Sequence, residues 1–231
     1  MQYWRYPKEM GKLIVIEGVD SSGKETQTKL LFEYLKEKGM NVKTISFPDY
    51  ESDFCMPVKR YLAGDLGDNP ADVNAYAASS FYAIDRYASY KQKWGSFYEN
   101  GGCVVCDRYV TSNIVHQAMK IKGDKSAFID WLSDFEYNKL GLPKPDAVRF
   151  LDMPPECAIY LMKNRANKIT GEEQKDIHEK NSDYLKQAYD NATGVCEHLG
   201  WKRIYCAEDG KIKTIPENHA EIKEFIEEIL K

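Results

Sequence analysis

A glycine, four further residues, a second glycine and a lysine stand between an apolar run and a helix-like segment, at Gly18 to Lys24. The run before them, Leu13 to Ile16, is short and rich in β-branched residues, which is typical of a buried strand. At such a junction glycines let backbone N–H groups turn inward, the helix N-terminus adds partial positive charge, and the lysine reaches terminal phosphates. The alternative is a tight turn with an exposed lysine. The flanking strand and helix favour a phosphate-binding loop.

One residue of this loop region departs from the usual pattern. A Ser or Thr that meets Mg²⁺ normally follows the lysine, but here Glu25 follows it and Thr26 comes next. Either Glu25 turns outward and Thr26 or a water takes the metal position, or Glu25 binds the water shell of the metal. Because the first turn of a helix stabilises negative charge, we expect the outward placement. The residues expected to contact nucleotide phosphates are Gly18, Ser21, Ser22, Gly23, Lys24, Glu25 and Thr26.

The composition limits the class of protein. The chain has 231 residues, 43 % of them apolar and 29 % charged, which suits a single domain with a sizeable core. A net charge of −4 argues against sequence-independent nucleic-acid binding. No run approaches the roughly 18 apolar residues of a membrane span, and the start of the chain lacks the apolar core of a signal peptide. The six cysteines lack zinc-site spacing, so we expect reduced thiols in a cytoplasmic protein that binds neither nucleic acid nor membrane.

Short apolar runs alternate with segments of helical spacing along the chain. This alternation implies right-handed crossovers and a parallel sheet, with ligands at the carboxyl ends of its strands. The fold class is therefore α/β, with five parallel strands flanked by helices. The expected strands are 13–18, 40–47, 103–106, 147–151 and 203–206, and the expected helices include 24–38, 72–94, 128–135, 157–163, 183–198 and 222–230.

Two charged residues follow the third strand, at the edge where the phosphate-binding loop lies. Asp107 is placed to hold Mg²⁺ directly or through water, and the alternative is that it caps a helix. Arg108 is a planar donor suited to a phosphoryl group, and the alternative is a surface ion pair.

Tyr82 and Arg86 lie four residues apart on an expected helix and therefore share one face. A ring and a guanidinium on one face suit a nucleobase, because the ring stacks on its plane and the guanidinium bonds its edge. The alternative is that they pack in the interior, and we expect most of the aromatic residues on this helix to be core: Tyr76, Phe81, Tyr82, Tyr87 and Tyr90.

Five motifs in the same order resemble the thymidylate kinases, P-loop nucleoside monophosphate kinases that phosphorylate dTMP. They span about residues 12 to 205 and are Glu17–Lys24, Phe81–Arg86, Asp107–Ser112, Leu142–Glu156 and Asp176–Glu179. The resemblance implies a three-layer P-loop fold with a small mobile lid, ATP as donor, a deoxynucleoside monophosphate as acceptor, Mg²⁺ as cofactor and a homodimer.

The resemblance also implies roles for individual residues. Arg108 would bind the acceptor phosphate, Tyr82 would stack on thymine, Arg86 would bond its exocyclic oxygen, and Asp20 would contact the acceptor sugar hydroxyl and the waters of the metal. The remaining acceptor-site positions are Phe47, Pro48, Ser112 and Gln117. Tyr50 stands where the family often has an arginine, which leaves that phosphate contact open.

The polar stretch of about residues 164–180 matches the lid of the family. Some members carry a transition-state arginine inside the phosphate-binding loop, where this chain has Ser21. Because phosphoryl transfer needs cations around the moving group, Arg165 or Lys168 of the lid is the candidate, and the alternative is a merely solvated loop. The expected catalytic set is Lys24, Arg108, Arg165 and Asp20.

Two other functions use a phosphate-binding loop. A nucleoside kinase would have no use for an arginine that clamps an acceptor phosphate, so Arg108 argues against it. A regulatory NTPase would hydrolyse slowly without an acceptor and leaves Tyr82 and Arg86 unexplained.

Overall fold

The computed structural model describes the backbone of residues 10–169 and 182–230, and the side chains of residues 10–162 and 185–230. Its centre is a five-stranded sheet in the order β2-β3-β1-β4-β5, in which every neighbouring pair is parallel. This is the α/β sheet expected from the alternation of apolar runs and helical segments. The strands are β1 (Leu13–Gly18), β2 (Val42–Ser46), β3 (Cys103–Asp107), β4 (Ala147–Asp152) and β5 (Lys202–Tyr205).

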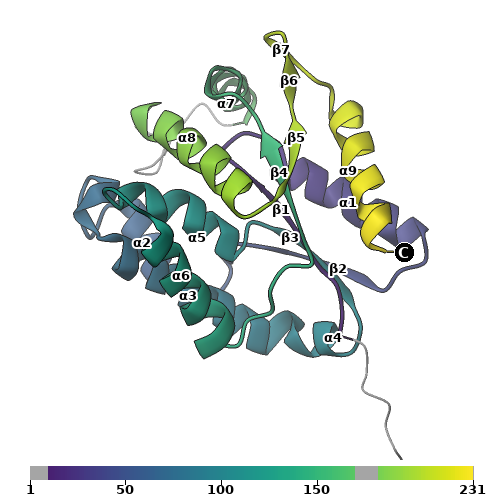
Figure 1. The fold of residues 1–231 in the computed structure, drawn as a ribbon, viewed down its shortest axis with the longest axis horizontal. Coiled ribbons are helices and arrows are strands. Elements are labelled where there is room, and N and C mark those ends of the chain that lie inside the picture. The colour runs from purple at the N-terminus through teal and green to yellow at the C-terminus, as the bar shows by residue number, and fades with distance from the viewer. Residues whose placement is uncertain (1–9, 170–181, 231) are drawn as a thin grey trace, which may run out of the picture.

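Helices cover both faces of the sheet and make three layers (Figure 1). The helices α1 and α9 pack on one face, with Leu31, Leu35 and Ile222 in that core. On the other face α5 and α6 enclose a second core, which includes Ile114 and Phe128. The helices are α1 (Lys24–Glu37), α2 (Met56–Ala63), α3 (Ala75–Ser89), α4 (Gly95–Glu99), α5 (Val110–Gln117), α6 (Ser126–Ser133), α7 (Pro155–Ile169), α8 (Ser182–His198) and α9 (Ile215–Ile229).

Burial explains the composition of the strands. All six residues of β1 are buried, which matches its run of β-branched residues at the middle of a sheet covered on both faces. The edge strand β2 has no fully buried residue: Val42 and Ile45 are half-buried and its other three residues are exposed. Because the strands are parallel, their carboxyl ends lie at one edge, where Gly18 is followed by the phosphate-binding loop and Asp107 by Arg108.

The segment expected as one helix over 72–94 is divided. Pro70–Asp72 forms a separate 3₁₀ turn, Val73 is extended, and α3 begins after Asn74, whose side chain accepts a hydrogen bond from the N–H of Ala77. The chain continues from α3 into a π-helical turn, Tyr90–Trp94, and a second π-helical turn, Asp134–Lys139, follows α6.

The expectation that most aromatic residues of this segment are core is wrong. Tyr76 and Tyr87 are 45 % and 38 % exposed, Phe81 and Tyr82 are half-buried, and Tyr90 is buried. The helix is amphipathic through its small residues instead, because Ala78, Ala83 and Ala88 face the interior. Aromatic side chains at helical spacing did not distinguish the buried face from the exposed one.

A short antiparallel hairpin, β6 (Ala207–Glu208) and β7 (Lys211–Ile212), follows β5 and was not expected from the sequence. Its turn is Asp209–Gly210, and both residues have positive φ, as a two-residue hairpin requires. Within the described part of the chain, no helix is long and apolar enough to cross a membrane.

Candidate active site

The loop between β1 and α1 brings backbone and side-chain donors to the carboxyl edge of the sheet. Gly18 must be glycine, because an added Cβ would lie 2.5 Å from Ser22 Oγ and 3.0 Å from the Leu151 carbonyl oxygen. Gly23 adopts φ 91° and Ser21 φ 60°, so the backbone turns through the left-handed region twice before the helix begins. A backbone that turns in this way can point its N–H groups inward and hold phosphate oxygens.

Lys24 lies inside the loop that it follows. The side chain is 7 % exposed, and Nζ donates to the carbonyl oxygen of Val19 at 2.8 Å. Burial, and then the charge of Arg108, lower the pKa of Lys24 from 10.5 to about 8. No carboxylate of the described residues contacts the ammonium, and the anionic oxygens of a phosphate would supply the negative partner.

The lowered pKa of Lys24 makes nucleotide binding depend on pH. Below about pH 8 the free protein holds the ammonium, whereas above it the anion must bind together with a proton. We therefore expect ATP affinity to be constant from pH 6.5 to 7.5 and to fall by up to about tenfold per unit above pH 8. Calorimetry in buffers of different ionisation enthalpy, which measures proton uptake, checks this. Equal affinity at pH 7 and pH 9.5 would contradict it.

Glu17 is a site residue to which the sequence analysis gave no role. Its carboxylate is fully buried and accepts from Thr111 Oγ1 at 2.6 Å, from Ser112 Oγ at 2.8 and 2.9 Å, and from the N–H of Gly18 at 2.9 Å. Arg108 Nη1 is 3.8 Å away. The carboxylate therefore joins the first glycine of the loop to the first turn of α5.

We expect Glu17→Gln to weaken this junction while preserving the size of the side chain. An amide has one acceptor oxygen, so at least one of the buried donors loses its acceptor, at a cost of about 1–3 kcal/mol in the free energy of unfolding. Urea unfolding measures this loss. Thr111→Val, which removes a single donor from the same carboxylate, is the matched control and should cost less. Equal stability of wild type and Glu17→Gln would contradict the bridging role.

Arg108 projects from a strained position at the end of β3. Its φ is 63°, and its guanidinium contacts Asp20, Ser112 Oγ at 3.2 Å and His116 Nε2 at 3.1 Å. Burial alone would lower the pKa of Arg108, but Asp20 and Glu17 raise it above its ordinary value. The guanidinium is thus permanently charged and fixed in orientation between the loop and α5.

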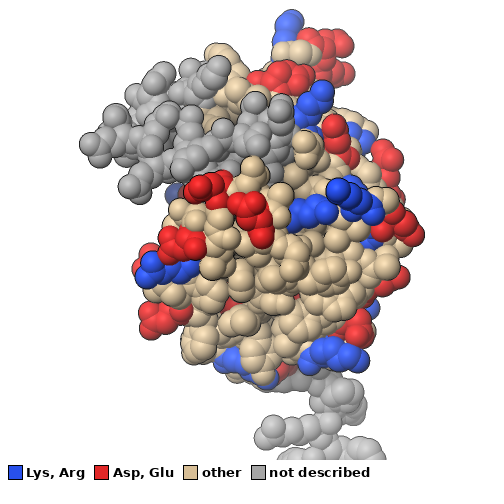
Figure 2. Space-filling view, turned by 90° about the vertical axis from the view of Figure 1, so that its left-hand side faces the viewer, with Lys and Arg blue, Asp and Glu red and all other residues tan. Residues whose placement is uncertain are grey.

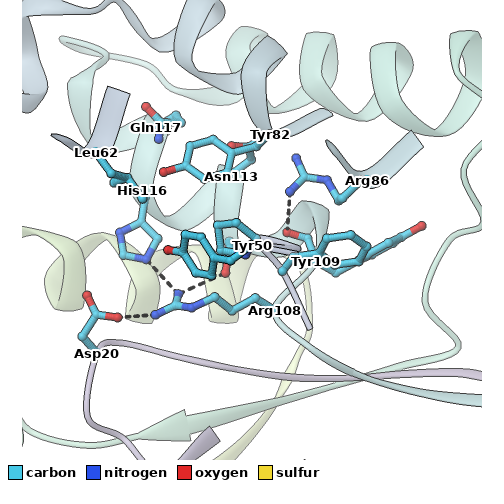
Figure 3. Close-up of a pocket in the computed structure, with 13 residues that line it drawn as sticks. Asp20, Tyr50, Leu62, Tyr82, Arg86, Arg108, Tyr109, Asn113, His116 and Gln117 are labelled. Carbon is cyan, nitrogen blue, oxygen red and sulfur yellow. Dashed lines mark hydrogen bonds and ion pairs between the residues drawn. The ribbon is translucent and has the colours of Figure 1, made fainter. Parts of the chain in front are cut away.

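A cavity beside Arg108 brings eight of the predicted site residues together (Figure 3). These eight are Asp20, Phe47, Pro48, Tyr82, Arg86, Arg108, Ser112 and Gln117. The other lining residues were not assigned to the acceptor site: Tyr50, Leu62, Tyr109, Asn113 and His116. Helical spacing could have identified Asn113 and His116, because they share the face of α5 that carries Ser112 and Gln117.

Arg86 lines this cavity but is not a free donor. Its Nε and Nη2 bond Glu136 at 2.7 and 2.6 Å, and Asn113 donates to the same carboxylate at 3.0 Å. Both charged side chains are almost fully buried. Nη1 does not bond Glu136 and is the donor available to the cavity, where it also lies 3.4 Å from the carbonyl oxygen of Tyr109. The sequence did not indicate Glu136, the residue that positions Arg86.

Several buried polar atoms at the site, Ser22 Oγ of the loop among them, have no hydrogen-bond partner among the described residues. Gln117 Oε1 belongs to the cavity wall, and Asp107 Oδ1 lies at the end of β3. Burial raises the pKa of Asp107, and Lys24 and Arg108 oppose that rise. Each atom is an acceptor that a bound molecule or ion could satisfy.

The residues present fit a Mg²⁺ ion held largely by phosphate oxygens and water. No group of three or more His, Cys, Asp and Glu suited to a metal occurs in the described residues. Mg²⁺ in nucleotide sites takes one or two carboxylates and keeps several waters, which Asp107 can satisfy. The side chain of Thr26 is exposed, and that of Glu25 is exposed as well. The charge of Glu25 nevertheless raises the pKa of Asp107, so the two carboxylates are electrostatic neighbours.

Glu25→Ser tests the residue at which the loop departs from its pattern. With the carboxylate outside the metal shell, the substitution removes repulsion from phosphate and restores a hydroxyl ligand. We therefore expect equal or higher turnover and no greater Mg²⁺ requirement, measured as the Mg²⁺ concentration for half-maximal rate. A variant that needs several-fold more Mg²⁺ would place Glu25 in the metal site.

The fold and this edge of the sheet define a P-loop nucleotide-binding protein. The cavity lined by Arg108 lies beside its phosphate-binding loop. A sequence model of the family described as thymidylate kinase matches residues 16–199. The chain belongs to the thymidylate kinase family.

Individual relatives agree with this, and a solved structure has the same fold. The chain is 31 % identical to the thymidylate kinase of Mycobacterium tuberculosis over 191 residues, which cover 82 % of this chain and 87 % of that one. It is 28 % identical to the thymidylate kinase of Caldicellulosiruptor saccharolyticus over 221 residues, 96 % and 98 % of the two chains. The structure of thymidylate kinase from Candida albicans superposes with a TM-score of 0.66 at 22 % identity, covering 94 % of this chain and 92 % of that one.

The predicted lid, residues 164–180, falls partly outside the described residues. The backbone of its first part belongs to α7, which extends to Ile169, so the helix is longer than the expected 157–163. The side chains of Arg165 and Lys168 lie outside the described residues. Their roles stay predictions.

Proposed function

We propose that this chain transfers the γ-phosphoryl group of ATP to a deoxynucleoside monophosphate, most specifically dTMP. The observation that carries the proposal is the cavity in which Arg108 lies beside the phosphate-binding loop and Gln117 lies deeper along α5 (Figure 3). One end of the cavity suits a phosphate and the other suits a polar ring. Membership of the thymidylate kinase family supports dTMP as the acceptor.

The acceptor would be held at both ends. Its phosphate would contact Arg108, and Asp20 would lie against its sugar. Gln117 Oε1 and Arg86 Nη1 are an acceptor and a donor at the other end, the pair that the N3–H and an exocyclic oxygen of thymine require. Tyr82, which lines the same cavity, would stack on the ring.

The chemistry needs positioning and electrostatic stabilisation rather than a protein nucleophile. Lys24 would neutralise charge on the transferred group, and Arg108 would keep the acceptor oxygen in place. Asp107 would hold Mg²⁺, directly or through water, and the ion would neutralise phosphate charge when bound. Arg165 or Lys168 would supply a further cation from a lid over about residues 164–180, in place of the arginine absent at Ser21.

The test is ADP release from ATP and Mg²⁺, with a panel of nucleosides and nucleoside monophosphates and with no acceptor. We expect dTMP to give the highest kcat/KM and thymidine to give none above background. Turnover on a nucleoside alone would favour a nucleoside kinase, whose acceptor carries no phosphate for Arg108. Hydrolysis that no acceptor accelerates would favour a regulatory NTPase.

A homodimer through α3 and its neighbours is part of the proposal. Tyr76, Ile84 and Tyr87 are large apolar side chains exposed on α3, and Trp131 of α6 contacts Tyr76 with ring centroids 4.6 Å apart. Figure 2 shows a broad expanse free of charged side chains on the left-hand face of Figure 1, where these helices lie. Such a patch is typical of an interface. Light scattering of wild type and Ile84→Glu tests it.

We place the protein in the cytoplasm. All six cysteines lie in the described part of the chain, and all are free and buried. Free thiols persist in a reducing compartment, which supports this assignment.

A further inference from the structure

A second cavity lies at the opposite edge of the sheet from the phosphate-binding loop. It has a volume of about 500 Å³ and is lined by the first residues of β4, the residues that lead into β5, and the end of α9. We call it the sheet-base cavity and define it by Tyr137, Lys144, Arg149, Trp201, Lys202 and Glu228. Lys144 and Arg149 lie within the Leu142–Glu156 motif, but the sequence analysis gave none of these six residues a role, and none belongs to the acceptor cavity.

The floor of the sheet-base cavity contains a buried cation without a contacting carboxylate. Arg149 is 4 % exposed, and its Nη1 and Nη2 donate only to carbonyl oxygens, of Val148 at 3.2 Å and Phe225 at 3.0 Å. Its Nε has no hydrogen-bond partner among the described residues. Buried charges are normally paired, because an unpaired charge away from water is costly. Burial accordingly lowers the pKa of Arg149, and the charge of Glu228 only opposes that change.

The rim adds two further cations. Lys202 Nζ lies over the Phe225 ring at 5.5 Å, and Lys144 Nζ lies over the Tyr137 ring at 5.8 Å. Neither lysine forms an ion pair among the described residues. Of the two acidic residues on the lining, Asp146 already pairs with Lys12 at 3.2 Å, which leaves Glu228 as the other negative charge. The balance of charge in the cavity is therefore positive.

We propose that the sheet-base cavity binds a small molecule that carries a phosphoryl group, with Arg149 at its floor and Lys144 and Lys202 at its rim. Guanidinium and ammonium donors are the groups that recognise phosphate oxygens. The volume exceeds that of phosphate alone, and Tyr137 and Trp201 give the wall two flat apolar surfaces. The site goes beyond the proposed kinase function, since it lies away from the phosphate-binding loop and needs no turnover.

Calorimetric titration with inorganic pyrophosphate tests the site in a protein whose phosphate-binding loop is disabled. In Lys24→Ala, with dTMP added to fill the acceptor cavity and occupy Arg108, we expect one pyrophosphate site to remain. Adding Arg149→Met, which keeps the length of the side chain, should weaken that site at least tenfold. A parallel titration with a nucleoside diphosphate shows whether the aromatic wall contributes, through tighter binding than pyrophosphate. No binding of either probe to Lys24→Ala at millimolar concentration would overturn the proposal.

Surface variants keep the test decisive if Arg149→Met does not fold. In the Lys24→Ala background, Lys202→Ala should weaken pyrophosphate binding several-fold. Lys43→Ala, which removes a lysine placed likewise over an aromatic ring on the far edge strand, should leave it unchanged. Glu228→Gln should strengthen binding, because the carboxylate competes with the anion for Arg149. If Lys202→Ala and Lys43→Ala weaken binding equally, the anion is held by overall charge and the assignment is wrong.

Discussion

Lys24→Ala should lower turnover about 100-fold or more and leave the fold intact, because a preorganised cation at the transferred phosphoryl group contributes on that scale. The side chain is buried within the loop, and its Nζ is held by the carbonyl oxygen of Val19 rather than by a carboxylate. Removing it therefore breaks no direct ion pair, and Arg108 still opposes the rise in the pKa of Asp107. The loss should appear in kcat, whereas stability to urea should change little.

A neighbouring lysine on the same helix gives the matched control. Lys29 is exposed on α1, so Lys29→Ala should retain full turnover. Steady-state kinetics at saturating ATP and dTMP, with circular dichroism of each variant, make the comparison. If Lys24→Ala keeps more than about a tenth of the wild-type turnover, the lysine does not stabilise the reacting phosphates.

The loop and its position could be predicted from the sequence because their causes are local. Gly18 and Gly23 serve backbone geometry that neighbouring residues impose, and the parallel sheet follows from the alternation of strands and helices, whereas the order of its strands was not predicted. Arg108 could likewise be placed, because the end of a parallel strand lies at the ligand edge.

Other parts of the site depend on contacts between distant segments. The sequence showed Glu17 only as part of a motif. In the structure its carboxylate accepts hydrogen bonds from hydroxyls more than ninety residues away, at Thr111 and Ser112. The partner of Arg86 is fifty residues away, at Glu136 on a π-helical turn. No spacing rule predicts such a pair. The prediction that most aromatic residues of α3 are core was wrong for a related reason, because the face of a helix that is buried depends on the segments that pack against it.

Arg86 is the residue at which a contact with a distant segment, here Glu136, has the largest expected effect on stability. The sequence offered two interpretations, a base-binding donor or an interior side chain, and the geometry combines them. Nε and Nη2 are committed to Glu136, whereas Nη1 reaches the acceptor cavity. A substitution of Arg86 alone therefore confounds two effects.

We expect Arg86→Ala to lower the free energy of unfolding by about 3–5 kcal/mol, because it leaves the carboxylate of Glu136 buried and uncompensated. Glu136→Ala should cost a similar amount for the converse reason. The double variant Arg86→Met/Glu136→Leu replaces the pair by apolar side chains of similar size, and such replacements are often neutral or stabilising. Urea unfolding of the three variants measures these differences.

Kinetics of the double variant then isolate the function of the guanidinium. If Arg86 Nη1 bonds the acceptor base, Arg86→Met/Glu136→Leu should be stable and yet show a raised KM for dTMP with little change in KM for ATP. Glu136→Gln keeps a hydrogen-bond acceptor for Arg86. Its affinity for dTMP should therefore be much closer to wild type than that of the double variant. A stable double variant with wild-type KM for dTMP would show that Arg86 acts only through its buried pair with Glu136. The base would then be recognised by Gln117 and Tyr82 without the arginine, because these residues line the remainder of that wall.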